Sequence, residues 1–228
     1  MTTRSIIVTG GFGTLGRATA AALAERGHAV ARVDQAPGAP AAAGTLDLAG
    51  VDLTDEGACR NAVATVRERF GGLDAVVNVA GGFLWETLGD GGIESWRRMF
   101  EMNVVTAATM SRAALPALRE SDSGRIVNVG AGAATQAASG MGAYAAAKAG
   151  VHRLTEALAA ELAGTSVTVN AILPSIIDTP VNRADMPDAD FGTWVQPGAI
   201  ADVVLFLISD ASRAISGALI PVSRGTPA

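Results

Sequence analysis

Cysteine is almost absent from this sequence, because Cys59 is the single one among 228 residues. One cysteine excludes an internal disulfide and is typical of a protein from a reducing compartment. Aromatic residues are also scarce, at 4%, and Tyr144 is the only tyrosine. His28 and His152 stand apart from cysteine and from clustered carboxylates. The sequence therefore predicts no metal site.

Long apolar runs and basic clusters are missing as well. The chain has no apolar run of about eighteen residues, the length that a membrane-spanning helix needs. Glycines follow the apolar residues 6–8 too early for a secretory signal peptide. The net charge is −5, without a basic cluster that would bind nucleic acid. We expect a cytoplasmic protein that binds a small molecule rather than nucleic acid or a membrane.

Apolar residues are abundant, at 49%, and they fall into alternating strand-like and helix-like segments. The length suits a single α/β domain over residues 1–228. Strands are expected at 6–8, 29–33, 46–51, 73–79, 125–129, 166–173 and 218–222. Helices are expected at 15–26, from a cap at Thr54 or Asp55 to Phe70, and at 94–118, 144–163 and 199–209. This alternation predicts a Rossmann-type, doubly wound parallel sheet with helices on both faces.

The stretch from Arg4 to Arg17 runs from a buried strand through a glycine turn into a helix. Its glycines stand at positions 10, 11, 13 and 16. Such a turn brings bare backbone N–H groups and a helix N-terminus beside the end of a strand, where a pyrophosphate binds. Asp34 ends the next strand, about twenty residues on, where an acid hydrogen-bonds the adenosine ribose and repels a 2′-phosphate. The alternatives are an ordinary turn and a turn residue at a strand end.

Tyr144 and Lys148 lie four residues apart at the start of an expected helix, so they share one face. A phenol with a pKa of about 10 is too weak an acid for proton transfer at neutral pH. A nearby ammonium and the positive ring of an oxidised nicotinamide would lower that pKa. The pair is therefore a candidate proton donor to a carbonyl that receives hydride. The alternative is a surface pair at helical spacing.

Taken together, these motifs resemble the short-chain dehydrogenase/reductase family over essentially the whole chain. The motifs are Thr9-Gly10-x-x-Gly13-x-x-Gly16, Asp34, Asp52, Asn78-x-Ala80-Gly81, Asn103, Tyr144-x-x-x-Lys148 and Pro174 through Thr179. The resemblance implies an NAD(P)-dependent oxidoreductase. The cofactor-binding residues that it implies are Thr9, Gly10, Gly11, Phe12, Gly13, Thr14, Leu15, Gly16, Asp34, Asp52, Leu53, Asn78, Ala80, Gly81, Tyr144, Lys148, Pro174, Ile177 and Thr179.

The resemblance also implies roles for the catalytic residues. Tyr144 would be the acid–base group, and Lys148 would bind the nicotinamide ribose and lower the tyrosine pKa. Asn103 would hold a water in a proton relay, or it is simply a buried polar residue of a helix. NADH is the expected cofactor because of Asp34, with NADPH as the second choice. The substrate pocket is expected at Gly82, Ala131, Ser139 and Tyr144.

The chain departs from the family pattern at three places. Thr14 takes the place of the middle glycine of the first motif, and Ser175 replaces the glycine after Pro174. Ala131 stands where the family has its catalytic serine, thirteen residues before the tyrosine. Ser139 or Thr135 is a candidate substitute, although their spacing does not decide it.

The departures, together with the segment from Leu173 to Trp194, resemble the quinonoid dihydropteridine reductase branch of the family. This likeness implies hydride transfer to a quinonoid or other small carbonyl substrate. The short segment 179–197 predicts a shallow, open pocket. The alternatives are a carbonyl reductase or alcohol dehydrogenase that lacks the usual serine, and a nucleotide-sensing protein without turnover.

The family resemblance further implies assembly into a homodimer or homotetramer. Its interface would be built by the helices at 94–118 and 144–163. Ala145, Ala149 and Ala157 would permit close approach of the helices.

Overall fold

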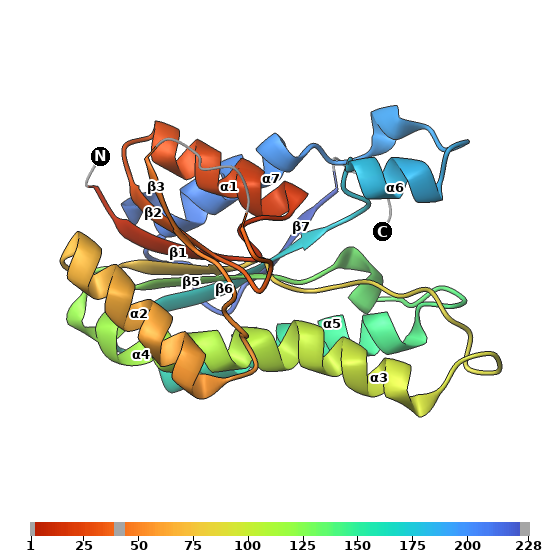
Figure 1. Ribbon diagram of the computed structural model, residues 1–228, viewed down its shortest axis with the longest axis horizontal. Coiled ribbons are helices and arrows are strands. Elements are labelled where there is room, and N and C mark those ends of the chain that lie inside the picture. The colour runs from red at the N-terminus through yellow and green to blue at the C-terminus, as the bar shows by residue number, and fades with distance from the viewer. Residues whose placement is uncertain (1–2, 39–43, 224–228) are drawn as a thin grey trace.

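The computed structural model describes residues 3–38 and 44–223, and in these ranges seven strands form one parallel sheet (Figure 1). The strand order is β3-β2-β1-β4-β5-β6-β7. Chain order reverses between β1 and β4, which creates a crevice at the carboxyl ends of these strands. The strands are β1 (Ser5–Thr9), β2 (Ala29–Val33), β3 (Thr45–Leu48), β4 (Ala75–Asn78), β5 (Arg125–Val129), β6 (Thr168–Pro174) and β7 (Leu219–Val222).

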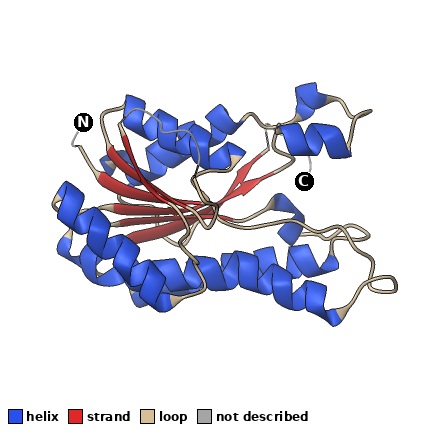
Figure 2. Ribbon diagram, in the orientation of Figure 1, coloured by secondary structure: helices blue, strands red, loops and turns tan. Residues whose placement is uncertain are grey.

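Helices cover both faces of this sheet (Figure 2). One face packs on α1 (Thr14–Glu25) and α7 (Pro197–Ile208), and the other on α2 (Glu56–Phe70), α4 (Thr106–Glu120) and α5 (Gly142–Glu161). Successive residues of β1 alternate between the two cores, because strand side chains point to opposite faces. The expected doubly wound Rossmann-type fold is confirmed. Among the described residues, no helix has the length and apolarity to cross a membrane.

The single helix expected at 94–118 is wrong in its middle. The structure has α3 (Ile93–Phe100), then a π-helical turn at Glu101–Val105, then α4. The Thr106 N–H donates to the Glu101 carbonyl five residues back, and the Asn103 side chain donates to the Met99 carbonyl at 2.9 Å. The side-chain bond reaches the same carbonyl that the Asn103 N–H would use in an α-helix, so it accompanies the wider turn.

Smaller differences concern two element ends. The expected strand 46–51 ends at Leu48, since Gly50 turns the chain at a φ of 70°. Of the two expected caps of α2, Asp55 is the one used, and its carboxylate accepts the Ala58 N–H at 2.8 Å.

Candidate active site

The glycine turn after β1 is shaped by two close contacts. Gly10 has a φ of +60°, and a Cβ there would come within 2.9 Å of the Ala80 backbone. A Cβ at Gly16 would lie 2.0 Å from the Gly10 carbonyl. Gly13 is the N-cap of α1 and no side chain bonds the first helical N–H groups. The turn therefore offers the backbone donors and the close approach that a pyrophosphate needs.

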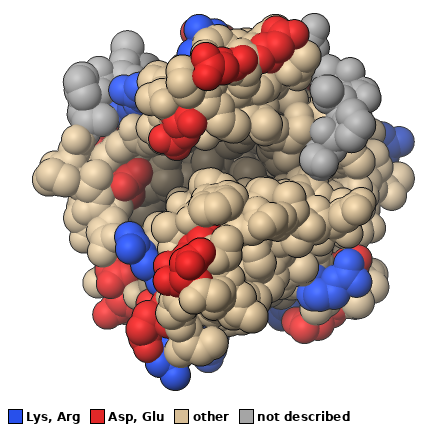
Figure 3. Space-filling model, turned by 90° about the vertical axis from the view of Figure 1, so that its right-hand side faces the viewer, with Lys and Arg blue, Asp and Glu red and all other residues tan. Residues whose placement is uncertain are grey.

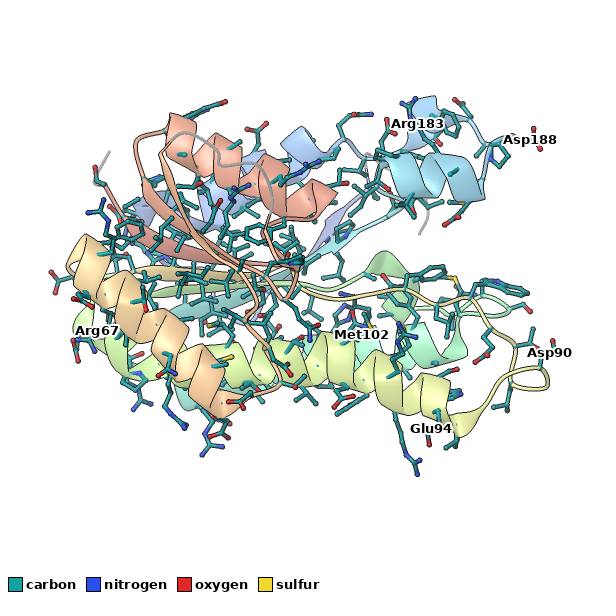
Figure 4. All side chains as sticks on the ribbon, viewed as in Figure 1. Arg67, Asp90, Glu94, Met102, Arg183 and Asp188 are labelled. Atoms are coloured by element: carbon teal, nitrogen blue, oxygen red, sulfur yellow. The ribbon has the colours of Figure 1, made fainter. Side chains whose placement is uncertain are left out.

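A groove of about 780 Å³ runs along this turn at the carboxyl ends of the strands. Predicted cofactor residues that line it are Gly10, Gly13, Thr14, Leu15, Gly16, Asp34, Asp52, Leu53, Ala80, Gly81 and Thr179. The sequence reasoning missed Gln35, Thr54, Val79, Arg98, Glu101, Met102 and Thr106. The last four flank or belong to the π-helical turn, and their shared helical face was the only available signal. Figure 4 labels Met102 beside the helix that runs from α3 through the π-helical turn into α4.

The end of the groove lined by Asp34 and Asp52 is acidic. The Asp34 carboxylate accepts the N–H groups of Phe12 and Ala36, both at 3.0 Å, which fixes it at the end of β2. Asp52 accepts both the N–H and the hydroxyl of Thr54, and these bonds lower the pKa of Asp52. Asp34 therefore presents a fixed negative charge where a ribose hydroxyl or a 2′-phosphate would sit.

Arg32 lies near Asp34 but is already engaged. It is 2% exposed and holds Asp47 through two bonds of 2.7 and 2.6 Å. The Phe12 ring stacks 5.3 Å from the Arg32 guanidinium carbon, and a Cβ at Gly11 would lie 2.6 Å from Arg32 Cβ. Gly11 and Phe12, both predicted to bind cofactor, thus pack on Arg32.

Two other predicted cofactor residues brace the groove from behind. Thr9 Oγ1 accepts the N–H groups of Val79 and Ala80 at 3.1 Å, which holds the end of β4 against β1. Asn78 is buried, and its amide donates to Ser111 and Asn128. Asn78 does not line the groove, contrary to expectation, because its side chain points into the core between β5 and α4.

Two of the three predicted catalytic residues, Asn103 and Lys148, lie close to Gly81. A Cβ at Gly81 would lie 2.5 Å from Asn103 Oδ1 and 3.3 Å from Lys148 Nζ, so only glycine leaves room for both groups. Lys148 is the only lysine of the chain and is 6% exposed. Its ammonium donates to the Val129 carbonyl at 2.8 Å, and burial lowers its pKa to about 8.

Tyr144 lies one turn before Lys148 on α5. Its ring contacts the Phe83 ring edge-on, with centroids 4.9 Å apart. Burial raises the pKa of Tyr144 to about 12, so the expected lowering is wrong for the chain alone. Since the pKa of Lys148 is about 8, the ammonium loses its proton before the phenol ionises. A positive charge on a bound cofactor would favour the phenolate.

Asn103 is 1% exposed at the centre of the π-helical turn. Its amide nitrogen also donates to the Gly82 carbonyl at 3.1 Å, and its oxygen accepts the Gly82 N–H at 3.3 Å. The side chain thereby fixes the loop after β4. Its predicted role in a water relay stays a prediction.

The position of the missing serine is filled without a hydroxyl. Ala131 is 5% exposed at the end of β5. Thr135 and Ser139 are both exposed, and the Thr135 hydroxyl donates to the Gly132 carbonyl at 2.7 Å. Of the remaining predicted pocket residues, Gly82 packs against Met102, where a Cβ would lie 2.4 Å from the methionine methyl carbon.

The segment between β6 and α7 forms a shelf opposite α3 and α5. It contains α6 (Pro180–Asp185), which the sequence reasoning did not foresee, and Thr179 accepts the Asn182 N–H as its N-cap. Arg183 binds Asp178 through bonds of 2.6 and 2.8 Å, and Gln196 binds the same carboxylate at 2.7 Å. These bonds lower the pKa of Asp178 to about 2.

The base of this shelf holds the last two predicted cofactor residues. Ile177 bridges to Val195, and Pro174 ends β6 in the interior. Figure 4 labels Arg183 on this shelf, and Figure 3 shows a hollow between the shelf and the opposite wall.

A glycine turn at the switch point of a parallel sheet, beside a helix that carries a tyrosine and a lysine, defines a dinucleotide-dependent oxidoreductase. Sequence comparison agrees with this class, because the family model described as short chain dehydrogenase matches residues 4–190. The chain belongs to the short-chain dehydrogenase/reductase family, whose members use NAD(P).

Individual relatives match over nearly their full lengths. The chain is 36% identical to cis-4-hydroxycyclohexanecarboxylate dehydrogenase of Sinomonas cyclohexanicum, covering 97% of this chain and 96% of the relative. It is 32% identical to a 3-oxoacyl-[acyl-carrier-protein] reductase of Escherichia coli, with coverages of 96% and 95%. The structure of a 3-ketoacyl-(acyl-carrier-protein) reductase from Brucella melitensis, complexed with NADH, matches with a TM-score of 0.87 at 25% identity, covering 96% of each chain.

Proposed function

We propose that this protein transfers hydride between NAD(H) and a small, neutral, ring-shaped ketone or secondary alcohol. The observation that carries the proposal is the meeting of Lys148 and Asn103 over Gly81, on the wall of the groove and one turn from Tyr144. The same residues would serve reduction and oxidation, since the proton path is reversible.

The groove fits the cofactor. The turn at Gly10 and Gly16 has no space for side chains, and the open N-terminus of α1 favours the negative pyrophosphate. Asp34 favours a ribose hydroxyl over a 2′-phosphate, and the nearby Arg32 is held by Asp47. These contacts support NADH over NADPH.

The chain's own residues handle the proton. Bound NADH supplies the hydride. Tyr144 donates the phenolic proton to the carbonyl oxygen as it gains negative charge, and it takes the proton back in the oxidation direction. Lys148, held by the Val129 carbonyl, lies on the same helical face and supplies positive charge beside the site.

The shape of the site supports a ring-shaped substrate. Phe83 and Trp85 follow the Gly81-Gly82 loop and remain 53% and 60% exposed. The Glu86 N–H donates to the Gly140 carbonyl at 2.8 Å, which ties the loop to the segment before α5; the Phe83 ring contacts Tyr144, and the Trp85 ring lies against Gly140. Flat aromatic faces favour planar or cyclic ligands. The surface around the hollow is largely uncharged, with acidic residues on its rim (Figure 3), which suits a neutral substrate.

The relatives favour this proposal over a quinonoid pterin. By name, the cis-4-hydroxycyclohexanecarboxylate dehydrogenase acts on a ring that carries a hydroxyl and a carboxylate, and the 3-oxoacyl-[acyl-carrier-protein] reductase acts on an oxo group. A pterin remains the second candidate because Ala131 offers no hydroxyl, and a conjugated quinonoid ring disperses the charge that such a donor would otherwise stabilise.

The test is a panel followed by the absorbance of NADH, with cyclohexanone, an acetoacetyl thioester and quinonoid dihydropterin as substrates. We expect cyclohexanone to be reduced faster than the other two. Tyr144→Phe keeps the ring packing and removes the proton donor, so turnover should fall by about a hundred- to ten-thousandfold while NADH still binds. Faster reduction of the pterin would favour the second candidate, and tight NADH binding without any turnover would favour a nucleotide sensor.

A further inference from the structure

Two side chains of α5 form hydrogen bonds with the backbone at and just after the end of β5. Lys148 Nζ donates to the Val129 carbonyl at 2.8 Å, and His152 Nε2 accepts the Ala131 N–H at 3.4 Å. Tyr144, Lys148 and His152 follow one another at four-residue spacing, so they lie on one face of the helix. The position that lacks the family's serine is therefore bound to the same helical face as the proton donor.

Gly130 lies between Val129 and Ala131, and the His152 ring packs directly against its Cα. A Cβ at Gly130 would lie 2.5 Å from His152 Nε2 and 2.8 Å from Cδ2, so the ring occupies the space of any side chain there. His152 is 3% exposed. The Gly130 N–H donates to the Ile172 carbonyl on β6 at 2.8 Å. The imidazole is thus a packed part of the site, wedged between α5 and the end of β5.

The contact with Ala131 requires a neutral ring. Nε2 can accept an N–H only when the ring proton is on Nδ1. Burial lowers the pKa of His152, and so do the charges of Arg153 and Lys148, whereas Glu156 opposes them. All three charged residues lie on α5, and the backbone against the ring, at Gly130 and Ala131 directly after β5, is uncharged. A second proton on the His152 ring would turn Nε2 into a donor that faces the Ala131 N–H, so the hydrogen bond would be lost. It would also place a positive charge one helical turn from Lys148.

The geometry points to His152 as a positioning residue for the reaction. In its neutral form it holds the Gly130–Ala131 segment, which directly follows β5, against α5, and it thereby fixes the Val129 carbonyl that orients Lys148. Protonation of His152 releases this segment, so turnover falls as the ring gains its proton. Only the kinetic arm of the test rests on the proposed function.

The kinetic arm compares His152→Gln with the natural protein across a pH series. Gln presents an amide oxygen that can accept the Ala131 N–H but cannot gain a proton. We expect the ratio of the Gln variant's kcat/KM to the natural value to rise once the pH falls below the pKa of His152, which burial lowers from its usual value, by up to about tenfold per pH unit. Effects of pH common to both proteins cancel in this ratio. His28→Gln is the matched control and should give a flat ratio.

The second arm needs no substrate. In the natural protein labelled with ¹⁵N-histidine, magnetic resonance should show His152 as the Nδ1–H tautomer. His28 should be the opposite, Nε2–H, tautomer, since its Nδ1 accepts the Arg4 N–H at 3.2 Å. The amide resonance of Ala131 should also move as His152 titrates.

Either arm can overturn the inference. A ratio for His152→Gln that stays flat with pH would overturn the positioning role, and an Nε2–H tautomer at His152 would overturn the contact itself. The tautomer is measured on the natural protein, so it decides the contact even where a variant fails to fold. A panel without turnover would refute the proposed function but leave the tautomer result standing.

Discussion

Binding of oxidised NAD should lower the pKa of Tyr144 by a measurable amount. In the chain alone, burial raises that pKa to about 12, and Lys148, with a pKa of about 8, is already neutral when the phenol ionises. The missing contribution is a positive charge that persists at high pH. The nicotinamide ring of oxidised NAD carries such a charge, whereas that of NADH does not.

The size of the effect follows from Coulomb's law. A unit charge roughly 4 Å from the phenolate oxygen contributes about 4 kcal/mol at an effective dielectric constant of about 20. Because 1.36 kcal/mol corresponds to one pKa unit, the pKa should fall by about 3, to roughly 9. A phenol with that pKa is a far better partner for proton transfer near neutral pH.

Tyr144 is the only tyrosine, so the ultraviolet absorbance of the phenolate reports this residue alone. The titration is run on the free protein, on the complex with oxidised NAD and on the complex with NADH. Only the oxidised complex should ionise at the lower pH, and Tyr144→Phe should show no phenolate signal. An ordinary pKa of about 10 in the free folded protein, or the same titration in both complexes, would refute the reasoning.

Three further predictions concern the cofactor, the missing hydroxyl and the assembly. NADH should bind more tightly than NADPH, because the Asp34 carboxylate repels the 2′-phosphate, and Asp34→Ala should reduce the difference between the two dissociation constants. Equal dissociation constants for the natural protein in calorimetry would contradict this preference. Ala131→Ser should raise cyclohexanone reduction, by at most on the order of a hundredfold, and change quinonoid pterin reduction little; a loss of both rates would argue against a missing oxyanion donor. Light scattering at micromolar concentration should show a dimer or tetramer, since Phe100 is 51% exposed beside Gly150 on the faces of α3 and α5. Detection of the monomer alone would exclude this assembly.

Much of the fold follows from local patterns in the sequence. Residues 29–33 and 125–129 are strands as expected, since short apolar runs between polar or glycine residues carry that information locally. The π-helical turn at Glu101–Val105 could not be predicted in the same way, because it depends on hydrogen-bond partners, such as the bond from the Asn103 side chain to the Met99 carbonyl, that no apolar pattern shows. The six residues of α6 are too few to show a helical period.

The features of the candidate site that local sequence determines were predictable, and those that depend on distant residues were not. The glycines of the turn were identifiable because the steric demand at Gly10 and Gly16 is local. Burial depends on residues distant in sequence, so the raised pKa of Tyr144 could not be predicted from its spacing to Lys148. The interior position of Asn78 likewise depends on its bonds to β5 and α4. Ala145 is buried within its own chain, and its expected place at a dimer interface stays a prediction.

The π-helical turn at Glu101–Val105 makes the active site sensitive to the number of residues in this part of the chain. A π turn holds about one residue more than an α turn, so a deletion within Glu101–Val105 leaves enough residues for an uninterrupted α-helix. Such a shortened chain keeps a sound helix and leaves α3 and α4 in about the same relation, because the turn loses only its extra residue, so the change is confined to the residues of the turn itself. The amide of Asn103 would then leave Gly82, and the loop that carries Gly81 would lose its brace. A change that is harmless to folding is therefore expected to remove the active site.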